Sequence, residues 1–245
     1  DLTPYGYKIG EKGFLGRGHF AEAHVAIREE DGREFVAKVV SLECLNDNDK
    51  KLAHQEVKLL QRLRHEYIVS FEQSYMLANN NLVILMEYCQ HGELRKEIKA
   101  LSGGPGRNAD YLKELQIMTW FTQLTLALNY MHAVKVLHRD LKSSNIFVTY
   151  KDHQTGGYGP VKLGDFGISR VLEGTIDAAV TVVGTPYYMS PDICRSEPYC
   201  YSSDVWALGC VLYEMCMLKH AFESDSLVGL VYKIVSDCYD DIDGR

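Results

Sequence analysis

The feature that most constrains this sequence is the spacing of three side chains that carry hard oxygen atoms: Asp140, Asn145 and Asp165. Asp140 and Asn145 lie five residues apart, between an amphipathic helical pattern and a short strand-like run, and Asp165 follows Asn145 by twenty residues. A carboxylate can accept a proton from a hydroxyl group, whereas an amide oxygen and a second carboxylate suit Mg²⁺. The spacing therefore predicts Asp140 as a proton acceptor and the other two residues as metal ligands.

Two features closer to the start of the chain predict phosphate binding. Gly16 and Gly18 follow a strand-like segment, and their spacing lets backbone N–H groups approach phosphate oxygens, although a tight hairpin would use glycines in the same way. Lys38 stands inside an apolar run, where a lysine needs an anion or a solvated face. Glu56 lies on the apolar stripe of a helix predicted over residues 50–64, so it needs a cation, and Lys38 is the candidate.

Composition narrows the class of protein. The 245 residues are 46% hydrophobic and 24% charged, as in an ordinary soluble globular protein, and the net charge of −7 argues against a nucleic-acid partner. The longest apolar run, Val205 to Tyr213, is too short to span a bilayer, and no apolar leader opens the chain, so we expect neither membrane insertion nor secretion. Seven scattered cysteines without a CxxC pair predict reduced thiols in a cytosolic or nuclear protein.

The apolar periodicity predicts a strand-rich first part and a helical second part. We expect strands within residues 7–40 and 67–88 around the helix at 50–64, and short strands at 145–149 and 161–164. An amphipathic helix is expected at 115–132, with Phe121 on its apolar stripe, and a helix at 203–217 that is apolar, and so buried, on nearly all sides. The fold class is therefore α+β, with one lobe over about 1–88 and another over about 89–245. The segments Leu101–Asp110 and Lys151–Pro160, rich in glycine and proline, are expected to be surface insertions.

Together these features resemble the eukaryotic protein kinases over essentially the whole chain. The motifs that carry the resemblance are His138-Arg139-Asp140-Leu141-Lys142-Ser143-Ser144-Asn145, Asp165-Phe166-Gly167, Gly184–Asp192 and Ser202–Gly209. Gly184–Asp192 looks like the substrate-facing end of the activation segment, and Ser202–Gly209 looks like the buried helix that anchors the catalytic loop. Within the kinases the chain is most similar to the NIMA-related (Nek) family, on the runs His138–Phe147, Leu163–Arg170, Gly184–Pro191 and Trp206–Phe222. Phe147 supports this placement, since most kinases have a smaller aliphatic residue there, on the floor of the adenine pocket.

The resemblance implies a bilobal serine/threonine protein kinase that uses ATP and Mg²⁺ and acts on protein substrates. It gives Asp140 the role of orienting the substrate hydroxyl and accepting its proton, and Lys142 that of neutralising charge on the γ-phosphate. The position of Lys142, two residues after Asp140, also resembles the pattern of serine/threonine kinases rather than that of tyrosine kinases. Lys38, held by Glu56, contacts the α- and β-phosphates, and Asn145 and Asp165 hold the metal.

The resemblance also implies the nucleotide-binding residues. They are Leu15, Gly16, Gly18, Ala23, Ala37, Lys38, Met86, Glu87, Cys89, Glu93 and Phe147. Met86 takes the gatekeeper position, the backbones of Glu87 and Cys89 meet adenine, and Glu93 reaches the ribose. We further expect the Cys89 thiol to be accessible at the mouth of the adenine pocket.

Three departures from the kinase pattern leave every catalytic group in place. Ala21 replaces the third glycine of the loop, Ala23 replaces the usual valine above adenine, and Asp192 replaces a glutamate that is one methylene longer. The resemblance also implies further helices beyond Arg245, so we expect the C-terminal lobe to be cut short and less stable than the complete lobe.

A regulatory site is expected beside the catalytic loop. Arg139 directly precedes Asp140, and a phosphate group can pair with such an arginine and order a loop. Of the candidates Thr175, Thr181 and Thr185, the resemblance selects Thr181, which matches the autophosphorylated position of Nek kinases. The alternative is that Thr181 is an ordinary solvent-facing residue.

Two other classes of protein compete with an active protein kinase. A catalytically silent pseudokinase scaffold would lack one of the catalytic residues, but Lys38, Glu56, Asp140, Asn145 and Asp165 are all present. A small-molecule kinase of related fold would leave the Gly-Thr-Pro-Tyr-Tyr run without a role. The Nek resemblance further implies a cytoplasmic protein, with the centrosome and the cilium as candidate locations.

Overall fold

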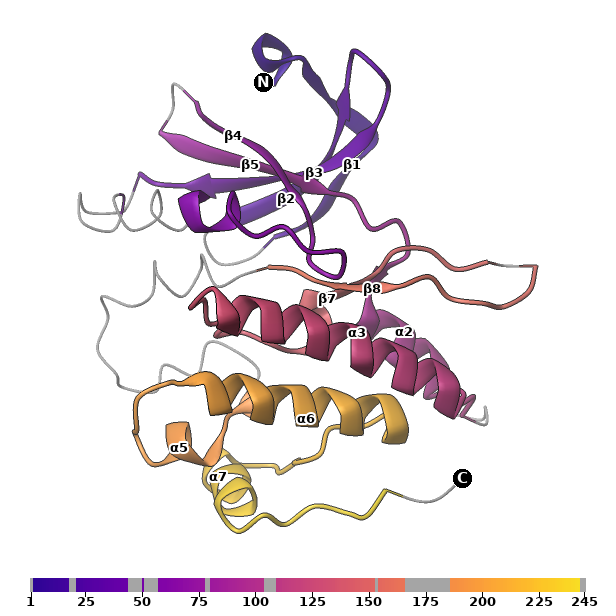
Figure 1. Ribbon diagram of the computed structural model, residues 1–245, viewed down its shortest axis with the longest axis vertical. Helices are drawn as coiled ribbons and strands as arrows, with labels where there is room; N and C mark the ends of the chain where they lie inside the picture. Colours follow the sequence, from indigo (N-terminus) through magenta and orange to yellow (C-terminus); the bar gives the residue numbers. More distant parts are fainter. Residues whose placement is uncertain are drawn as a thin grey trace. The chain divides into compact units, whose positions relative to one another are not determined.

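The computed structural model describes most of the chain in two compact units (Figure 1). The described residues are 2–17, 21–43, 50, 57–77, 80–103, 109–152, 154–165 and 186–242. Among them, one unit covers residues 2–89 and the other covers 90–165 together with 186–242. The predicted site residues Gly18, Glu56 and Thr181 lie outside the described residues.

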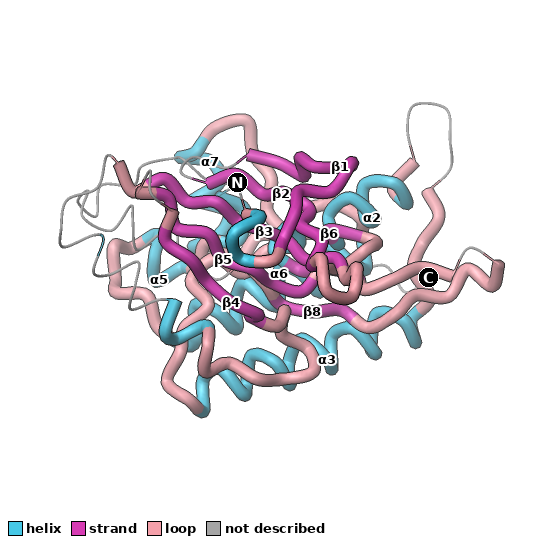
Figure 2. Tube along the Cα trace, turned by 90° about the horizontal axis from the view of Figure 1, so that it is seen from above, coloured by secondary structure: helices cyan, strands magenta, loops and turns pink. Residues whose placement is uncertain are grey.

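The first unit is built on one antiparallel sheet. Its strands are β1 (Tyr7–Arg17), β2 (Ala21–Arg28), β3 (Glu34–Ser41), β4 (Phe71–Met76) and β5 (Asn81–Glu87), after a short 3₁₀ helix, η1 (Thr3–Tyr5). They lie in the order β1-β2-β3-β5-β4, which Figure 2 shows as neighbouring magenta strands. The strands predicted within 7–40 and 67–88 are confirmed. Of the predicted helix at 50–64, residues 50 and 57–64 are described. Residues 50 and 57–60 are helical, whereas 61–64 form a turn and a loop, so the predicted C-terminal end is four residues too long.

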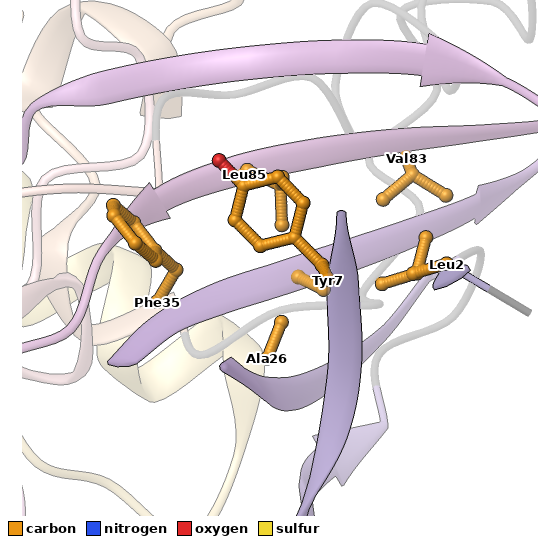
Figure 3. Close-up of a cluster of buried hydrophobic side chains, with 7 residues drawn as sticks. Leu2, Tyr7, Ala26, Phe35, Val83 and Leu85 are labelled. Carbon is orange, nitrogen blue, oxygen red and sulfur yellow. The ribbon is translucent and has the colours of Figure 1, made fainter. Parts of the chain in front are cut away.

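Apolar side chains cover one face of this sheet as a buried cluster (Figure 3). Its members are Leu2, Tyr7, Ala26, Phe35, Ala37, Val83 and Leu85. The rings of Tyr7 and Phe35 meet edge to face, with centroids 5.7 Å apart. Successive residues of a strand point to opposite faces of a sheet. The even-numbered residues of β3 therefore point away from this cluster, and that is the face on which Lys38 lies.

The second unit contains a small sheet and several helices. The sheet has the order β6 (Gly92–Glu93), β7 (Ile146–Val148) and β8 (Val161–Leu163). The helical elements are α2 (Leu94–Leu101), α3 (Glu114–Ala133), η2 (Ser143–Asn145), η3 (Pro186–Tyr188), α5 (Pro191–Cys194), α6 (Tyr201–Met217) and α7 (Leu227–Val235). Helices α3 and α6 pack against each other (Figure 1). The helices and short strands predicted for this part of the sequence are confirmed.

The two long helices differ in detail from the sequence expectation. Trp120 is the fully buried aromatic residue of α3, whereas Phe121, placed on the predicted buried stripe, is only half-buried. The prediction that α6 is buried on nearly all sides is wrong at Val205, which is 56% exposed. Positions 202, 205 and 209 are all exposed and recur at helical spacing, so α6 has one solvent-facing stripe despite its apolar composition. None of the helices in the described ranges combines the length and apolarity that a bilayer crossing requires.

Candidate active site

In the first unit, the sheet register brings three predicted nucleotide-site residues into one row. Gly16 of β1 pairs with Ala23 of β2, and Ala23 in turn pairs with Lys38 of β3. Directly opposed residues on neighbouring strands point to the same face of a sheet. Ala23 and Lys38 therefore share a face, with Gly16 at its edge, and Lys38 is buried there.

The structure does not bring Ala37 to this face. Ala37 pairs with Leu85 and belongs to the apolar cluster on the opposite face. Val36, two residues before Lys38, lies on the Lys38 face and pairs with the predicted gatekeeper Met86. Val36 is therefore the small apolar residue beside the lysine. Counting back in steps of two along the strand would have identified it from the sequence.

The end of the first unit carries the two residues whose backbones are expected to meet adenine, Glu87 and Cys89. Glu87 ends β5, and its side chain accepts a hydrogen bond from the backbone N–H of Ser70, at 3.2 Å. Cys89 is buried, with 6% of its surface exposed, so the expectation of an accessible thiol is wrong. A thiol packs as a small apolar group, and cysteine is among the residue types most often buried. Leu15, on β1, is 40% exposed.

In the second unit, Asp140 lies between two other predicted catalytic residues. The side-chain nitrogen Nδ2 of Asn145 donates to the carbonyl oxygen of Asp140 at 2.8 Å and to its carboxylate Oδ2 at 2.9 Å. The Lys142 ammonium Nζ also lies 2.8 Å from Oδ2. This carboxylate is thus held as an anion in a fixed orientation while 27% of its side chain remains exposed. A partly exposed carboxylate can accept a proton from a hydroxyl group.

The two predicted metal ligands flank strands that pair with each other, because Asn145 directly precedes β7 and Asp165 lies two residues after β8. The backbone N–H of Gly164 donates to the carbonyl of Asn145 at 3.0 Å, so Asp165 begins its segment directly beside Asn145. Because the side-chain nitrogen of Asn145 is hydrogen-bonded to Asp140, the side-chain oxygen of the same amide points away from Asp140. One amide oxygen and one carboxylate fit Mg²⁺, which proteins commonly hold through one or two side chains together with phosphate oxygens and water. A bound Mg²⁺ would be held here by Asn145 and Asp165.

A buried carboxylate that the sequence reasoning did not select, Asp204 of α6, anchors the backbone of the catalytic loop. It is 0% exposed and accepts four hydrogen bonds. Its Oδ1 accepts from the N–H of Arg139 at 3.1 Å and from the Tyr199 hydroxyl at 2.5 Å. Its Oδ2 accepts from the N–H of His138 at 3.0 Å and from the ring of His132 at 2.9 Å. Each oxygen therefore holds one backbone group of the loop and one side chain.

Two residues of the site have an unusual backbone conformation. Arg139 has a φ of 66° and Asp165 a φ of 53°, a left-handed conformation that non-glycine residues adopt only when their surroundings enforce it. His138 is 1% exposed, and burial lowers the pKa of its imidazole. Its neutral ring nitrogen Nδ1 accepts from the N–H of Asp140 at 3.4 Å. The exposed side chain of Arg139, the predicted partner of a regulatory phosphate, is not needed for these contacts.

A second buried network ties the catalytic loop to η3. The Ser143 hydroxyl donates to Glu214 Oε1 at 3.1 Å, and the Tyr188 hydroxyl donates to Glu214 Oε2 at 2.5 Å. The two hydroxyl oxygens lie 3.0 Å apart. Burial, together with the neighbouring charge of Glu214, raises the pKa of Tyr188, so this hydroxyl stays protonated and donates. The residue that follows Lys142 is thereby linked to the segment expected to face the substrate.

The last two predicted nucleotide-site residues are brought together by the small sheet. Glu93 of β6 and Phe147 of β7 are direct register partners. The Glu93 carboxylate also lies 2.7 Å from the Lys96 ammonium. The residue expected to reach the ribose and the residue expected to form the adenine floor thus stand side by side in the second unit.

Comparison with known proteins agrees with this arrangement. The sequence profile of the protein kinase domain matches residues 9–240. The chain belongs to the protein kinase family, and its α+β fold is the one that the sequence predicts.

The predicted resemblance to the Nek kinases is confirmed as well. Over 92% of its length the chain is 45% identical to serine/threonine-protein kinase Nek1 of Mus musculus, and over 90% it is 42% identical to Nek5 of Homo sapiens and 40% identical to Nek4 of Mus musculus. It spans only 18%, 29% and 26% of those proteins, respectively.

Proposed function

We propose that this chain is the catalytic domain of a Nek-like serine/threonine protein kinase, which transfers the γ-phosphate of ATP to hydroxyl groups of protein substrates. One observation carries the proposal: the Asp140 carboxylate is held between the Asn145 amide and the Lys142 ammonium, at 2.9 Å and 2.8 Å. A carboxylate that is fixed, charged and partly exposed suits the orientation of an acceptor hydroxyl.

In this proposal Asp140 orients the serine or threonine hydroxyl and takes its proton as the oxygen bonds to the γ-phosphorus and ADP leaves. Lys142 neutralises charge on the transferred group. Asn145 and Asp165 hold Mg²⁺, which would offset the phosphate charge. Phosphoryl transfer needs little covalent help from the protein, so positioning and charge stabilisation provide most of the catalysis.

The residues that would bind the nucleotide are those that the kinase resemblance implies. Gly16 and Gly18 cover its phosphates, and Lys38, paired with Glu56, contacts them. Around adenine and ribose the proposal places Leu15, Ala23, Val36 in the position expected for Ala37, Met86, Glu93, Phe147 and the backbones of Glu87 and Cys89. The shared row of Gly16, Ala23 and Lys38 and the pairing of Glu93 with Phe147 support this assignment.

Regulation and location complete the proposal. Phosphorylation of Thr181 would add an anion for the exposed Arg139 side chain and order the loop around it. The similarity to Nek kinases favours a cytoplasmic protein that acts at the centrosome or the cilium. Imaging of a tagged protein tests the location directly.

Phosphoamino acid analysis tests the reaction class. The purified protein is incubated with ATP labelled at the γ-phosphate, Mg²⁺ and casein, and the labelled casein is hydrolysed. We expect phosphoserine and phosphothreonine. Label on phosphotyrosine alone would contradict the predicted specificity, and the absence of label on any protein would favour a silent scaffold.

A further inference from the structure

Helix α2 contains a buried carboxylate, Glu97, that none of the catalytic roles above uses. Glu97 is 7% exposed, and both of its oxygens are bonded. The Lys151 ammonium lies 2.8 Å from Oε1, and the Tyr158 hydroxyl donates to the same oxygen. The ring nitrogen Nε2 of His91 lies 2.7 Å from Oε2. Glutamate is rarely buried unless it is paired, so this cluster of four side chains is a built feature of the fold.

The partners of Glu97 come from the two segments that carry the Glu93–Phe147 pair. His91 directly precedes the two-residue strand β6, which contains Glu93. Lys151 and Tyr158 face each other across a bridge in the hairpin that extends β7 and β8 beyond Phe147 (Figure 1). Glu97 therefore connects the start of β6 to the outer end of the β7–β8 hairpin. Strand β7 of this hairpin is the one with which β6 pairs.

The hairpin itself rests on α3. The Tyr158 ring packs edge-on against the ring of Trp120, with centroids 5.1 Å apart, and Trp120 is fully buried. The indole N–H of Trp120 donates to the carbonyl of Gly159 at 3.0 Å. The prediction of a surface insertion at Lys151–Pro160 is thus only partly right, because one side of the segment is packed against the helices.

Electrostatics keep the cluster charged. Burial alone would raise the pKa of the Glu97 carboxyl, but the hydrogen bonds from Lys151, Tyr158 and His91 outweigh it and hold the pKa below its ordinary value. The same contacts with Glu97 hold the pKa of Lys151 above its ordinary value, against the opposing effect of burial. At neutral pH a carboxylate thus faces three donors, which an uncharged amide cannot satisfy equally.

We propose that Glu97 is a positioning residue for the nucleotide, which clamps β6 to the β7–β8 hairpin and so keeps Glu93 and Phe147 paired beside the ribose and the adenine. The inference rests on the proposed function, because the proposed function assigns ATP as the ligand of the Glu93–Phe147 pair. Glu97 itself would not touch ATP.

Titration calorimetry with Mg²⁺ and ATP, together with steady-state kinetics on casein, tests the inference. We expect Glu97→Gln to weaken ATP binding and raise the KM for ATP by roughly five- to tenfold, the order expected when the net contribution of about one hydrogen bond is lost. The kcat at saturating ATP and the KM for casein should stay within about twofold of wild type, since neither depends on the ribose and adenine contacts.

Two further variants keep the test sharp. Asp152→Asn removes one carboxylate charge from the same hairpin, where the Asp152 carboxylate accepts from the backbone N–H of Gln154 and from the hydroxyl of Thr155, and it should leave ATP binding unchanged. Tyr158→Phe keeps the ring that packs on Trp120 and loses only the hydroxyl. It should raise the KM for ATP in the same direction as Glu97→Gln, and it replaces that variant if the latter fails to fold.

The outcomes separate the inference from the proposed function. If the wild type binds ATP and both cluster variants bind it equally well, the positioning role is wrong and the kinase assignment stands. A fall in kcat with equal rises in both KM values would show a general structural role and would also overturn the inference. If the folded wild type neither binds ATP nor transfers phosphate, the proposed function itself fails.

Discussion

The side-chain amide of Asn145 donates a hydrogen bond to the carboxylate of Asp140 at 2.9 Å, so a predicted metal ligand also positions the predicted proton acceptor. Both roles depend on the two ends of one amide group: the nitrogen faces Asp140 and the oxygen is left for the metal.

Asn145→Asp should therefore disable the site while preserving the fold. The change replaces the donor by a second carboxylate next to Asp140, and repulsion between like charges raises the pKa of one of them. We expect kcat to fall by at least about a hundredfold, the scale of general acid–base catalysis, with a change in melting temperature of a few degrees. A turnover number within threefold of wild type would contradict the proposed role.

Tyr199 should contribute to both stability and turnover through Asp204. Its hydroxyl is one of the two side-chain donors to this buried carboxylate, at 2.5 Å. Tyr199→Phe removes that donor and should lower the free energy of unfolding by about 1–3 kcal/mol. Asp204 also accepts hydrogen bonds from the backbone N–H groups of His138 and Arg139, which directly precede Asp140. We therefore expect kcat to fall more than the KM for ATP rises.

Urea denaturation and steady-state kinetics measure these two effects. Tyr201→Phe is the matched control, because Tyr201 is 40% exposed and contacts the ring of His132 through its own ring. It should leave both quantities near wild type. An equal loss in the two variants would show that Asp204 does not need the Tyr199 hydroxyl.

His138 should make the domain less stable as the pH falls. Burial lowers the pKa of this imidazole from its ordinary value of 6.5, so below pH 6.5 the unfolded chain binds a proton that the folded chain refuses. Its contribution to stability is complete above pH 6.5 and is lost as the pH falls toward the folded-state pKa, with a slope of at most about 1.4 kcal/mol per pH unit. Urea denaturation between pH 7.5 and pH 5 measures it.

The control for this pH dependence is His138→Gln, which does not titrate. We expect the free energy of unfolding to fall less steeply with decreasing pH in this variant than in the wild type. Parallel curves for the two proteins would assign the pH dependence to other groups.

How much of this site the sequence predicts depends on how local each relationship is. The Asp140–Asn145 pair is encoded within five residues and the short strands within three, so spacing and motif chemistry identify them. The sequence also encodes which face of a strand each side chain occupies, because successive residues alternate between the two faces. Assigning Ala37 to the Lys38 face overlooks this alternation, which places Val36 there instead.

The remaining relationships depend on tertiary packing. Asp204 lies 66 residues from His138 in the sequence, and Glu97 lies 54 residues from Lys151. In the sequence Glu97 looks like an ordinary surface charge, and the motif Ser202–Gly209 marks the helix of Asp204 without showing which groups its carboxylate binds. Their burial, and the exposure of Val205 on an apolar helix, follow from which neighbours the fold brings to each side.

Phosphorylation of Thr181 should raise activity through Arg139. We expect phosphatase treatment to lower the transfer rate, Thr181→Ala to reproduce the loss, and Arg139→Ala to remove the dependence on phosphatase. The transfer rate on casein before and after treatment measures all three. A Thr181→Ala variant that remains fully active and phosphatase-sensitive would place the switch at another residue.

The central claim is that Asp140 makes this chain an active phosphotransferase. The most direct measurement compares the rate of γ-phosphate transfer from ATP to casein by the wild type and by Asp140→Asn, with folding of both checked by their melting curves. We predict measurable transfer by the wild type and a loss of at least about a hundredfold in the variant, the scale of general acid–base catalysis. Equal rates in the two folded proteins, or no transfer by the wild type, would contradict the account.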